Sequence, residues 1–556
     1  MSHQSQKVNC QNCKNDFTIE PDDFSFYKKM KVPTPSVCPD CRFKIRAIWR
    51  NEMSLYNRKC YVTGENIISV FQPNSLYKVV NVDFYKSDNW DPKSFAIDYD
   101  FNKTFFEQLA ELLKNVYKKS LFPVLSLGPN TNSPYVNFVG SAKNSYMCFN
   151  SAFLEDTMYT KGVTNIKNSL DLYYCDAIEN CYECVNVSKS YNVIYGKNSS
   201  SCMDSVLIDS CVNCSNCFGC VNLRNKSYCW FNEQLSKEEY EEKFKEIIGT
   251  YKKFELAKNE FHNFNLKYPK RVNNNINTLD SSGEYLFDSK NCESCFEVGL
   301  SENCKFIFSA RKSKDSIGSI GGLGAFECLE NMTPNLSSRL IGTSTCENCQ
   351  NVEYSFCLTN CKDCIGCDSL KNSQYCILNK QYEKVEYEKI REHIIKELTE
   401  LGLYGLMMPP ELSPFAYNET VGQDNMPLTR EEAIAQGYRW EDDIQKTEGK
   451  ETLKLEDLPD NIKDVEDSII KEVLACKDCN RNFKITEQEL MLYRKLVLPI
   501  PHQCFYCRHK ERIERRGPYK FWSRNCAKCD KNIVTNYAPE RPEIVYCERC
   551  YQNEVY

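Results

Sequence analysis

Four C-x2-C pairs close together in the last stretch of the sequence restrict the possible folds of this chain more than any other feature. The pairs form two tetrads, and within each tetrad the two pairs are separated by a span long enough for a hairpin. Two such loops can place four thiolates around one tetrahedral ion. The first tetrad is Cys476, Cys479, Cys504 and Cys507, and the second is Cys526, Cys529, Cys547 and Cys550.

The same pattern opens the chain. A shift of 466 positions places five early cysteines on five late ones without a gap, namely Cys10, Cys13, Cys38, Cys41 and Cys60. The early copy of the second tetrad is incomplete, because Thr63, Asn81 and Phe84 replace its other three cysteines. None of these three is a good zinc ligand. We therefore predict three metal ions per chain and a front subdomain that keeps its fold through apolar contacts of Phe84 and Phe71.

Both ends of the chain resemble known zinc modules. The order C-x2-C, F-x-I, F-Y-K-K and C-P-x-C-R resembles small bacterial zinc-ribbon domains of the treble-clef type, over about the first forty residues and again from Cys476. The segment CAKCDKNIVTNYAPERPEIVYCERC is similar to a companion two-knuckle zinc domain. The resemblance implies that two ligands of each site come from a hairpin and two from the start of a helix.

The cysteine content indicates the compartment and the metal. The N-terminus, MSHQSQKVNC, has no apolar core of a signal peptide, and no run is long enough to span a membrane, so we expect a reducing cytoplasm for the 34 cysteines. The five histidines are too scattered to complete the sites. A redox motif or an iron centre is the alternative, but here every C-x2-C pair has a partner pair. Four cysteines close the coordination sphere of zinc, which predicts three structural zinc ions.

The middle of the chain predicts a repetitive β structure. From about Ser141, short β-rich segments alternate with Asn and Ser, and cysteines recur at a nine-residue step from Cys175 to Cys229. Such a step is typical of a β-solenoid, in which one side chain per turn stacks on the next. Nine residues are too few for a closed turn, so we expect turns of about eighteen residues.

This block is duplicated. A shift of 147 residues places Cys214, Cys217, Cys220 and Cys229 on four later cysteines, and each copy ends in C-x-G-C-x2-L-[RK]-N-x2-Y-C-x2-N-x-Q. Ser236 and Glu239 form a capping box that predicts a helix after the first copy. With its flanking modules, the chain resembles cysteine-rich bacterial proteins in which zinc-ribbon domains flank a repetitive middle. That resemblance implies an architecture and no activity.

The predicted fold is multidomain α+β, with treble-clef zinc modules flanking a two-part β-solenoid that has a helix after each half. A segment before the first copy, TFFEQLAELLKNVYKK, predicts one helix, and Thr429 caps another. The expected boundaries are 1–90 for the N-terminal zinc module, 91–139 for a helical connector, 140–265 and 280–404 for the two halves, 405–473 for a linker and 474–556 for the C-terminal module.

One run of cysteines permits two interpretations. Cys211, Cys214, Cys217 and Cys220 are spaced three apart, which is similar to a ferredoxin ligand loop, but the fourth ferredoxin spacing and its proline are absent. Residues three apart on an extended strand also face opposite sides. We favour core packing over an iron–sulfur cluster.

Basic residues beside the zinc ligands also permit two interpretations. Aromatic residues lie among them, so they can form a face that binds phosphates and stacks bases. Alternatively, they neutralise the charge of the zinc tetrathiolates. The candidates are Arg42, Arg46, Arg508, Arg512, Arg515 and Arg516.

These patterns favour a non-catalytic binding protein over an enzyme. No local motif pairs a nucleophile with a base, and the cysteine-rich repeats contain no histidine. RNA or DNA is the first partner that we expect, and a scaffold for other proteins is the alternative. An enzyme ranks third. The sequence indicates no membrane association and leaves the oligomeric state open.

Overall fold

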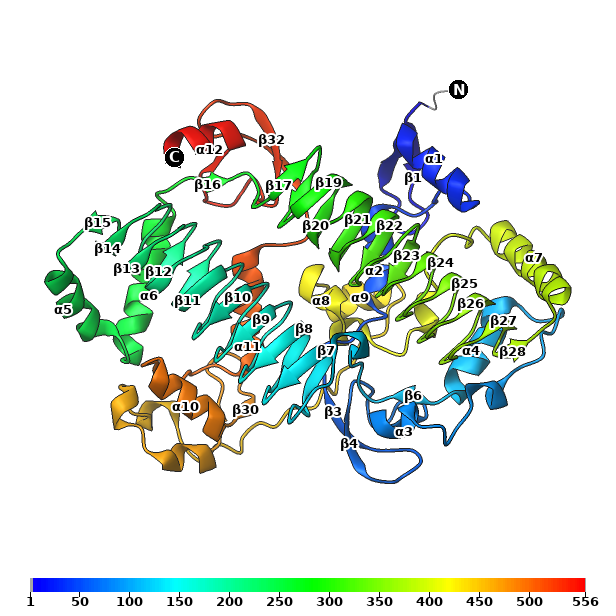
Figure 1. The fold of residues 1–556 in the computed structure, drawn as a ribbon, viewed down its shortest axis with the longest axis horizontal. Coiled ribbons are helices and arrows are strands. Elements are labelled where there is room, and N and C mark those ends of the chain that lie inside the picture. The colour runs from blue at the N-terminus through cyan, green and yellow to red at the C-terminus, as the bar shows by residue number, and fades with distance from the viewer. Residues whose placement is uncertain (1–3, 556) are drawn as a thin grey trace. The chain divides into compact units, whose positions relative to one another are not determined.

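The computed structural model describes residues 4–555, which divide into two compact units of two segments each. Unit 1 combines Met1–Leu121 with Asn275–Ile444, and unit 2 combines Phe122–Asn274 with Gln445–Tyr556. Each unit therefore joins one terminal cysteine-rich module to the sheet that lies in the other half of the sequence (Figure 1). The sequence predicted the modules and the repeats, but not this exchange.

A nine-stranded sheet forms the core of unit 2, and a twelve-stranded sheet forms the core of unit 1. All neighbouring strands are parallel except the last pair of each sheet. The strands of unit 2 are β7 Val136–Lys143, β8 Cys148–Glu155, β9 Thr164–Lys167, β10 Asp176–Glu179, β11 Ser188–Lys197, β12 Met203–Asp209, β13 Ser215–Phe218, β14 Ser227–Trp230 and β15 Glu233–Gln234. Those of unit 1 are β17 Ile276–Leu279, β18 Gly283–Glu284, β19 Phe287–Glu293, β20 Cys295–Gly299, β21 Glu302–Arg311, β22 Lys314–Ile320, β23 Leu329–Met332, β24 Ser338–Ile341, β25 Gln350–Glu353, β26 Lys362–Ile365, β27 Gln374–Ile377 and β28 Lys380–Gln381.

The parallel register repeats every twelve residues in both sheets, except that β17 and β19 pair with an offset of eleven, as in Ile276 with Phe287. Val136 pairs with Cys148, Cys217 with Cys229, and Cys364 with Cys376. Isolated bridges between the strands keep the same offset. The expected turn of eighteen residues is therefore wrong.

Within each repeat, every third residue has a left-handed backbone. The φ angles of Asn186, Lys189, Asn192, Tyr195 and Asn198 are 51°, 49°, 52°, 57° and 49°. Asn tolerates this conformation better than most residues, which explains the many Asn residues in the repeats. The left-handed residues interrupt the alternation of an extended strand, so that side chains three apart all point into one core.

The cysteine spacing follows from this period of three. Cys211, Cys214, Cys217 and Cys220 belong to one buried cluster, so the expectation that they face opposite sides is wrong. Their S–H groups also satisfy the backbone: Sγ of Cys211 donates to the carbonyl of Cys220 at 3.5 Å. The nine-residue step in the sequence corresponds to three inward positions of the core.

Helices follow the last strands of each sheet and also form part of each module. The predicted capping box at Ser236 and the predicted cap Thr429 both begin helices at the expected places, and Thr429 also forms a capping box. The helices of unit 1 are α1 Pro21–Met30, α2 Pro39–Ala47, α3 Val82–Lys86, α4 Phe105–Asn115, α7 Lys384–Glu400, α8 Val421–Asn425 and α9 Arg430–Ala435. Those of unit 2 are α5 Lys237–Ile247, α6 Tyr251–Asn265, α10 Glu487–Lys495, α11 Phe505–Arg516 and α12 Glu548–Val555. None of the helices in residues 4–555 combines the length and the apolar character that a bilayer span requires.

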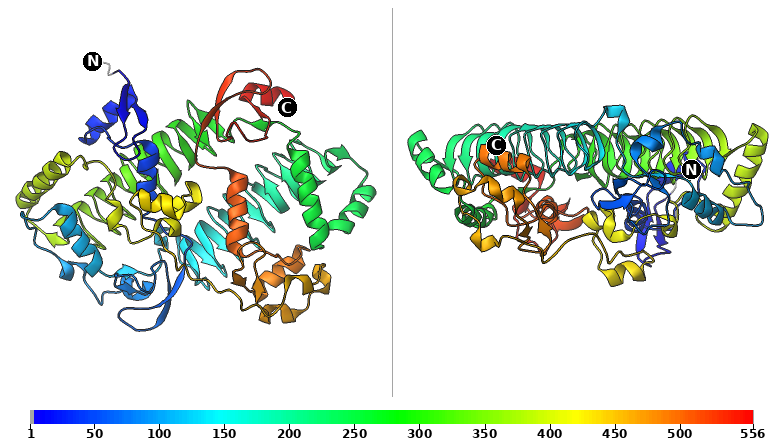
Figure 2. Two further views of the ribbon diagram at one scale, coloured as in Figure 1. Left: turned by 180° about the vertical axis from the view of Figure 1, so that it is seen from behind. Right: turned by 90° about the horizontal axis from the view of Figure 1, so that it is seen from below.

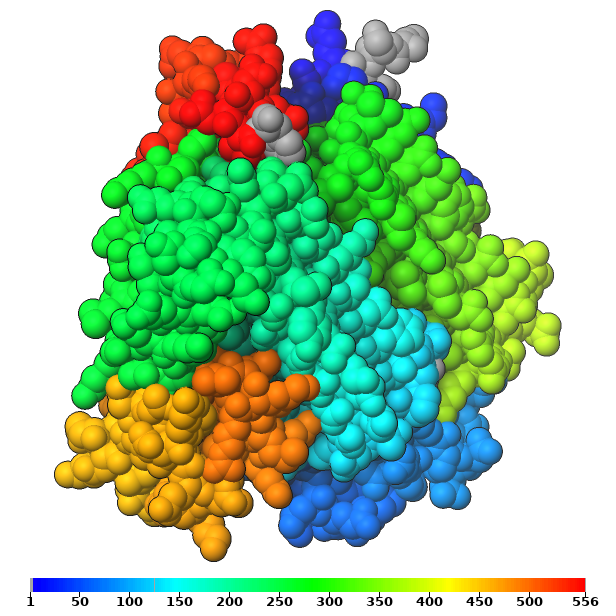
Figure 3. All heavy atoms as spheres, turned by 60° about the vertical axis from the view of Figure 1, so that its left-hand side comes forward, coloured from blue at the N-terminus to red at the C-terminus, as the bar shows by residue number. Residues whose placement is uncertain are grey.

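Short hairpins complete the modules. They are β1 Gln6–Asn9 with β2 Asp16–Ile19, β3 Tyr56–Lys59 with β4 Asn66–Ser69, β29 Leu474–Ala475 with β30 Asn482–Phe483, and β31 Trp522–Asn525 with β32 Asn532–Thr535. Two parallel pairs connect further segments, β5 Val79–Val80 with β6 Lys118–Lys119 and β16 Lys270–Arg271 with β33 Val545–Tyr546. In unit 2, α11 crosses one face of the strands (Figure 2), and the segment around α10 packs against the same unit (Figure 3).

Part of the segment expected as a linker, 405–473, packs into unit 1. Met408 and Tyr417 are fully buried. Ser413 Oγ donates to the carbonyl of Ile48 at 2.7 Å, and the backbone N–H of Val421 donates to that of Arg50 at 3.1 Å. This segment therefore covers the end of the N-terminal module.

Candidate metal centres

The structure brings all twelve predicted ligands together in three groups of four. In each group the four Sγ atoms lie within 4.8 Å of one another. The groups are Cys10, Cys13, Cys38 and Cys41; Cys476, Cys479, Cys504 and Cys507; and Cys526, Cys529, Cys547 and Cys550. The ligand sets are the predicted ones.

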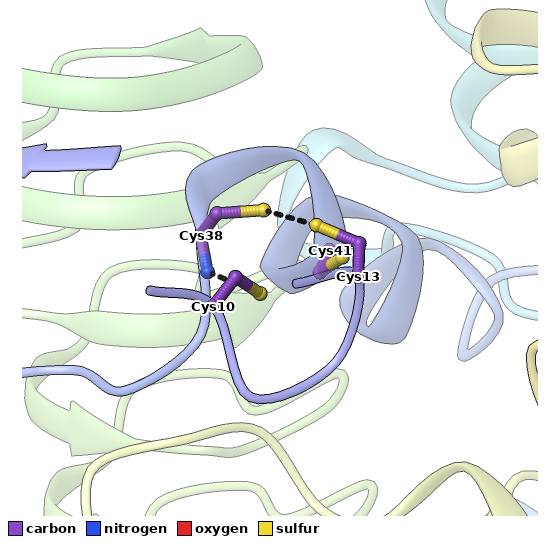
Figure 4. Close-up of side chains that lie close together, drawn as sticks. All are labelled: Cys10, Cys13, Cys38 and Cys41. Atoms are coloured by element: carbon purple, nitrogen blue, oxygen red, sulfur yellow. Dashed lines mark hydrogen bonds between the residues drawn. The ribbon is translucent and has the colours of Figure 1, made fainter. Parts of the chain in front are cut away.

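In the first group, a hairpin turn and a helix start face each other (Figure 4). Cys10 and Cys13 lie at the turn after β1, Cys38 is the N-cap of α2, and Cys41 lies in its first turn. The Sγ atoms of Cys13 and Cys38 are 3.6 Å apart. Two ligands thus come from a hairpin and two from a helix, as the resemblance implied.

The second group repeats this geometry in unit 2. The N–H of Gln11 donates to the carbonyl of Ser36 at 2.9 Å, and at the equivalent positions Lys477 donates to His502 at 2.9 Å. Cys504 is the N-cap of α11, as Cys38 is of α2. The shift of 466 residues therefore relates the hydrogen bonds of the two modules as well as their cysteines.

Backbone N–H groups favour the ionised form of the first cysteine in each group, and they lower the pKa of Cys476 as well as those of Cys10 and Cys526. Burial opposes ionisation of Cys10, but the N–H groups of Cys38, Cys13 and Asn12 outweigh it and lower its pKa to about 6. The same balance of burial against backbone N–H groups lowers the pKa of Cys526 to about 6. The thiolate is the form that binds a metal, and burial with neighbouring thiols raises the pKa of Cys550 in the same group to about 12.

The third group and the incomplete site at Cys60 share a frame. The N–H of Ala527 donates to Val545 at 3.0 Å, and the equivalent Tyr61 donates to Val79 at 2.8 Å. Arg524 donates to the carbonyls of Ala538 and Glu543, and Arg58 donates to the equivalent carbonyls of Gln72 and Tyr77. The front subdomain therefore has the same hydrogen-bonded frame without three of the four cysteines.

Asn81, which replaces one of the missing cysteines, makes two hydrogen bonds within the incomplete site. Its N–H donates to Cys60 Sγ at 3.4 Å, and its Oδ1 caps α3 by accepting from the N–H of Phe84 at 2.6 Å. Phe84 packs with Tyr117 in the cluster around Cys60, as expected, whereas Phe71 contacts Phe415 elsewhere. Within the part of the chain that the structure describes, Cys60 belongs to no group of three possible ligands.

The six candidate arginines do not form an exposed face. Arg46 is 1% exposed and Arg512 is fully buried. Arg512 contacts carboxylate oxygens of both Asp171 and Glu183 at 2.9 Å, and Arg46 contacts Glu330. A shift of 147 places Glu183 on Glu330, so the two ion pairs are equivalent.

The other four candidates also point into the interface between module and sheet. Their partners are Glu330 for Arg42, Asp171 for Arg508, the carbonyl of Glu183 for Arg515 and the hydroxyl of Tyr173 for Arg516, at 2.7–2.9 Å. Five of the six side chains are buried and that of Arg515 is 16% exposed, so this set of guanidinium groups offers no exposed face for phosphates. The acidic partners were not predicted from the sequence, although Glu183 and Glu330 occupy equivalent positions of the 147-residue repeat.

The comparisons with known proteins identify no family. No family model and no curated protein matches the chain. A structure with a partial match is that of a "putative acetyltransferase" from Desulfovibrio desulfuricans G20, at 10% identity and a TM-score of 0.10. The match covers 36% of this chain and 61% of that one. A similarity at this level carries no argument about fold or function.

Proposed function

We propose that the protein is a non-catalytic scaffold held together by three structural zinc ions. The observation that carries this proposal is the convergence of four Sγ atoms in each of three groups. Thiolates suit zinc, and four of them leave no open position for water or a substrate. A structural zinc ion contributes about 10–16 kcal/mol in finger peptides, which is more than a module of this size obtains from its own core.

We further infer that each sheet is a β-solenoid with twelve-residue turns. The twelve-residue parallel register of most strand pairs and the buried core of every third residue support this interpretation. The zinc sites then act as clamps, because α2 and α11 each begin at a ligand and carry the arginines that contact the sheet. Zinc binding and docking of the module on its solenoid are therefore coupled.

For the partner, we favour a protein with a basic segment over RNA or DNA. A cavity of about 850 Å³ in unit 1 lies between α1 and the sheet and is lined by Glu20, Asp22, Asp23, Asp280, Glu293 and Asp315. Lys305 is paired with Asp23 and Glu293, and Lys29 with Asp315, so the lining keeps a net negative charge. Such a lining attracts cations and repels phosphates.

The equivalent place in unit 2 supports this assignment by contrast. There Tyr146 replaces Glu293 and Tyr135 replaces Ser282, and their rings pack 5.0 Å apart. Gln488 of α10 also donates to the carbonyl of Asn144 at 2.8 Å. One copy of the repeat thus has two packed aromatic rings at this place, while the other has a charged cavity.

Elemental analysis of the purified protein tests the zinc assignment. We expect three zinc ions per chain, two for Cys41→Ser and three for Cys60→Ala, because Cys60 belongs to no group of possible ligands among residues 4–555. Four zinc ions in the parent would contradict the assignment of an incomplete site. Two would mean that one of the tetrads does not bind zinc.

Affinity capture from native cells tests the partner. The expected partner remains bound after nuclease treatment and is lost from an Asp22→Asn, Asp280→Asn variant. A partner that nuclease releases, and that this variant retains, would instead support nucleic-acid binding.

A further inference from the structure

The first strand of the unit 1 sheet has an open edge. β17 lies at the end of the strand order, and within residues 4–555 it pairs with β19 alone. An edge strand presents backbone N–H and C=O groups on its outer side, and these can pair with another chain. Natural edges are commonly protected against this by charged side chains, by proline or by a covering segment.

The side chains of β17 do not protect its edge. Ile276 and Leu279 are apolar, yet they are 59% and 55% exposed. Asn277 and Thr278 lie between them, so the strand carries neither a charge nor a proline. Unit 1 therefore presents a regular strand with exposed apolar side chains at this end of its sheet.

The corresponding segment of unit 2 is identified by its hydrogen bonds. The N–H of Val124 donates to the carbonyl of Val139 at 3.0 Å, and the N–H of Ile276 donates to that of Leu286 at 2.8 Å. Leu286 follows Val139 by 147 residues, which is the period of the duplication. Val124 therefore occupies in unit 2 the position of Ile276 in unit 1.

In unit 2 this end of the sheet is protected. Val124 is followed by a 3-10 helix, η2 Leu125–Leu127, and then by Pro129, where unit 1 continues as a strand. A helical turn interrupts the row of backbone groups, and a proline has no N–H to donate. The two copies of the repeat thus differ in whether their first edge can accept a further strand.

The acidic cavity of unit 1 begins at the same edge. Asp280 follows β17 directly and lines the cavity. It precedes Asn291 by eleven residues, the offset by which β17 pairs with β19. The row continues across the sheet, because Asn291 Nδ2 donates to Asn303 Oδ1 at 3.1 Å and Asn303 Nδ2 donates to Asp315 Oδ1 at 2.8 Å. All four residues line the cavity, so a strand added to β17 would lie at its mouth.

The charge at this mouth favours a basic occupant. Lys29 and Lys305, the two lysines of the lining, already have carboxylate partners. Asp22 of α1 and Asp280 are exposed on the two sides of the cavity. These carboxylates attract a cation that arrives from solvent and repel an acidic chain.

We propose that an extended basic segment of another protein adds to β17 as a further strand and places a lysine or arginine at the mouth of the cavity. This inference rests on the proposed basic partner and adds how that partner binds. Main-chain hydrogen bonds to an open edge supply affinity, and alternate side chains supply specificity. Apolar residues of the segment would cover Ile276 and Leu279, while basic residues would reach Asp280.

The test uses a short synthetic peptide of alternating valine and lysine as the probe, with binding to the zinc-loaded full chain measured by fluorescence anisotropy. Two control peptides carry N-methyl groups on every valine or on every lysine, so that each lacks the N–H groups of one edge. We expect the probe to bind, and at least one methylated peptide to bind about tenfold more weakly or worse, because backbone hydrogen bonds are lost.

A pair of matched variants tests the place of binding. Ile276→Ser, Leu279→Ser should weaken binding of the probe, because the apolar contacts at the edge are lost. Leu300→Ser, Leu336→Ser should not, since these leucines of unit 1 are similarly exposed, at 47% and 52%, but lie outside β17. Equal melting temperatures of the two variants show that neither effect comes from unfolding.

Three outcomes would overturn the added strand. If both methylated peptides bind like the probe while Asp22→Asn, Asp280→Asn abolishes binding, the basic partner stands but it adds no strand. If the probe does not bind even at low salt, the basic partner and the added strand both fail. If the protein is a dimer that Ile276→Ser, Leu279→Ser converts to a monomer, a second copy of this chain occupies the edge.

Discussion

The arginines beside the zinc ligands, which the sequence suggested as a phosphate-binding face, are buried in ion pairs and hydrogen bonds with the sheets. Arg42 and Arg46 both contact Glu330, and all three side chains are at least 96% buried. A buried charge is tolerated only when it is paired, because the desolvation of an ion is costly. The pairs therefore fix which surface of the sheet receives the module.

Glu330→Gln should lower the free energy of unfolding by about 3–5 kcal/mol, because it leaves two buried guanidinium groups without a counter-charge. Denaturant titration of the zinc-loaded protein measures this. The matched control is Asp442→Asn, whose partner Arg430 is half exposed, and it should change stability by no more than about 1 kcal/mol. Equal effects of the two substitutions would show that the buried pair is not needed for docking.

At the level of helices and strands, some features could be predicted from the sequence and others could not. The zinc ligands were predictable, because each pair lies within four residues and chemistry dictates the spacing. The register was not, because the left-handed residues that create a period of three appear in the sequence only as frequent Asn and Ser. The arginine contacts were also hidden, since Arg46 and Glu330 are 284 residues apart.

A substitution at one left-handed position tests the period of three. Asn198 has φ 49°, and its Oδ1 accepts from Asn186 Nδ2 at 3.0 Å. Asn198→Val should cost about 1–2 kcal/mol more than Asn198→Gly, because a β-branched residue is strained there and glycine is not. Thermal unfolding monitored by circular dichroism compares the two. If valine is tolerated as well as glycine, the backbone at this position is not left-handed in solution.

At the scale of the whole molecule, the two halves of the chain exchange their modules. Residues before 122 dock on the sheet of 275–444, and residues after 444 dock on the sheet of 122–274. Neither half of the sequence contains a complete unit. Each unit therefore needs one segment from the first half of the sequence and one from the second half.

Co-expression of 1–274 and 275–556 as separate chains should yield a one-to-one complex with three zinc ions. Each fragment alone leaves buried carboxylates such as Glu183 or Glu330 without their arginines, so we expect neither to be stable by itself. Size-exclusion chromatography with light scattering measures the complex, and Glu183→Lys with Glu330→Lys should abolish it. Two fragments that stay folded and separate would contradict the exchange.

The exchange also sets an order of events on the ribosome. The N-terminal module has its four ligands by Cys41, long before the strands that it covers are synthesised. The last strand of the first sheet ends at Gln234. Asp171 and Glu183 of that sheet can pair only with arginines of α11, which are synthesised later, after Cys504. Until α11 is synthesised, these two carboxylates therefore have no arginine partners. A chain that is terminated before α11 would keep them unpaired.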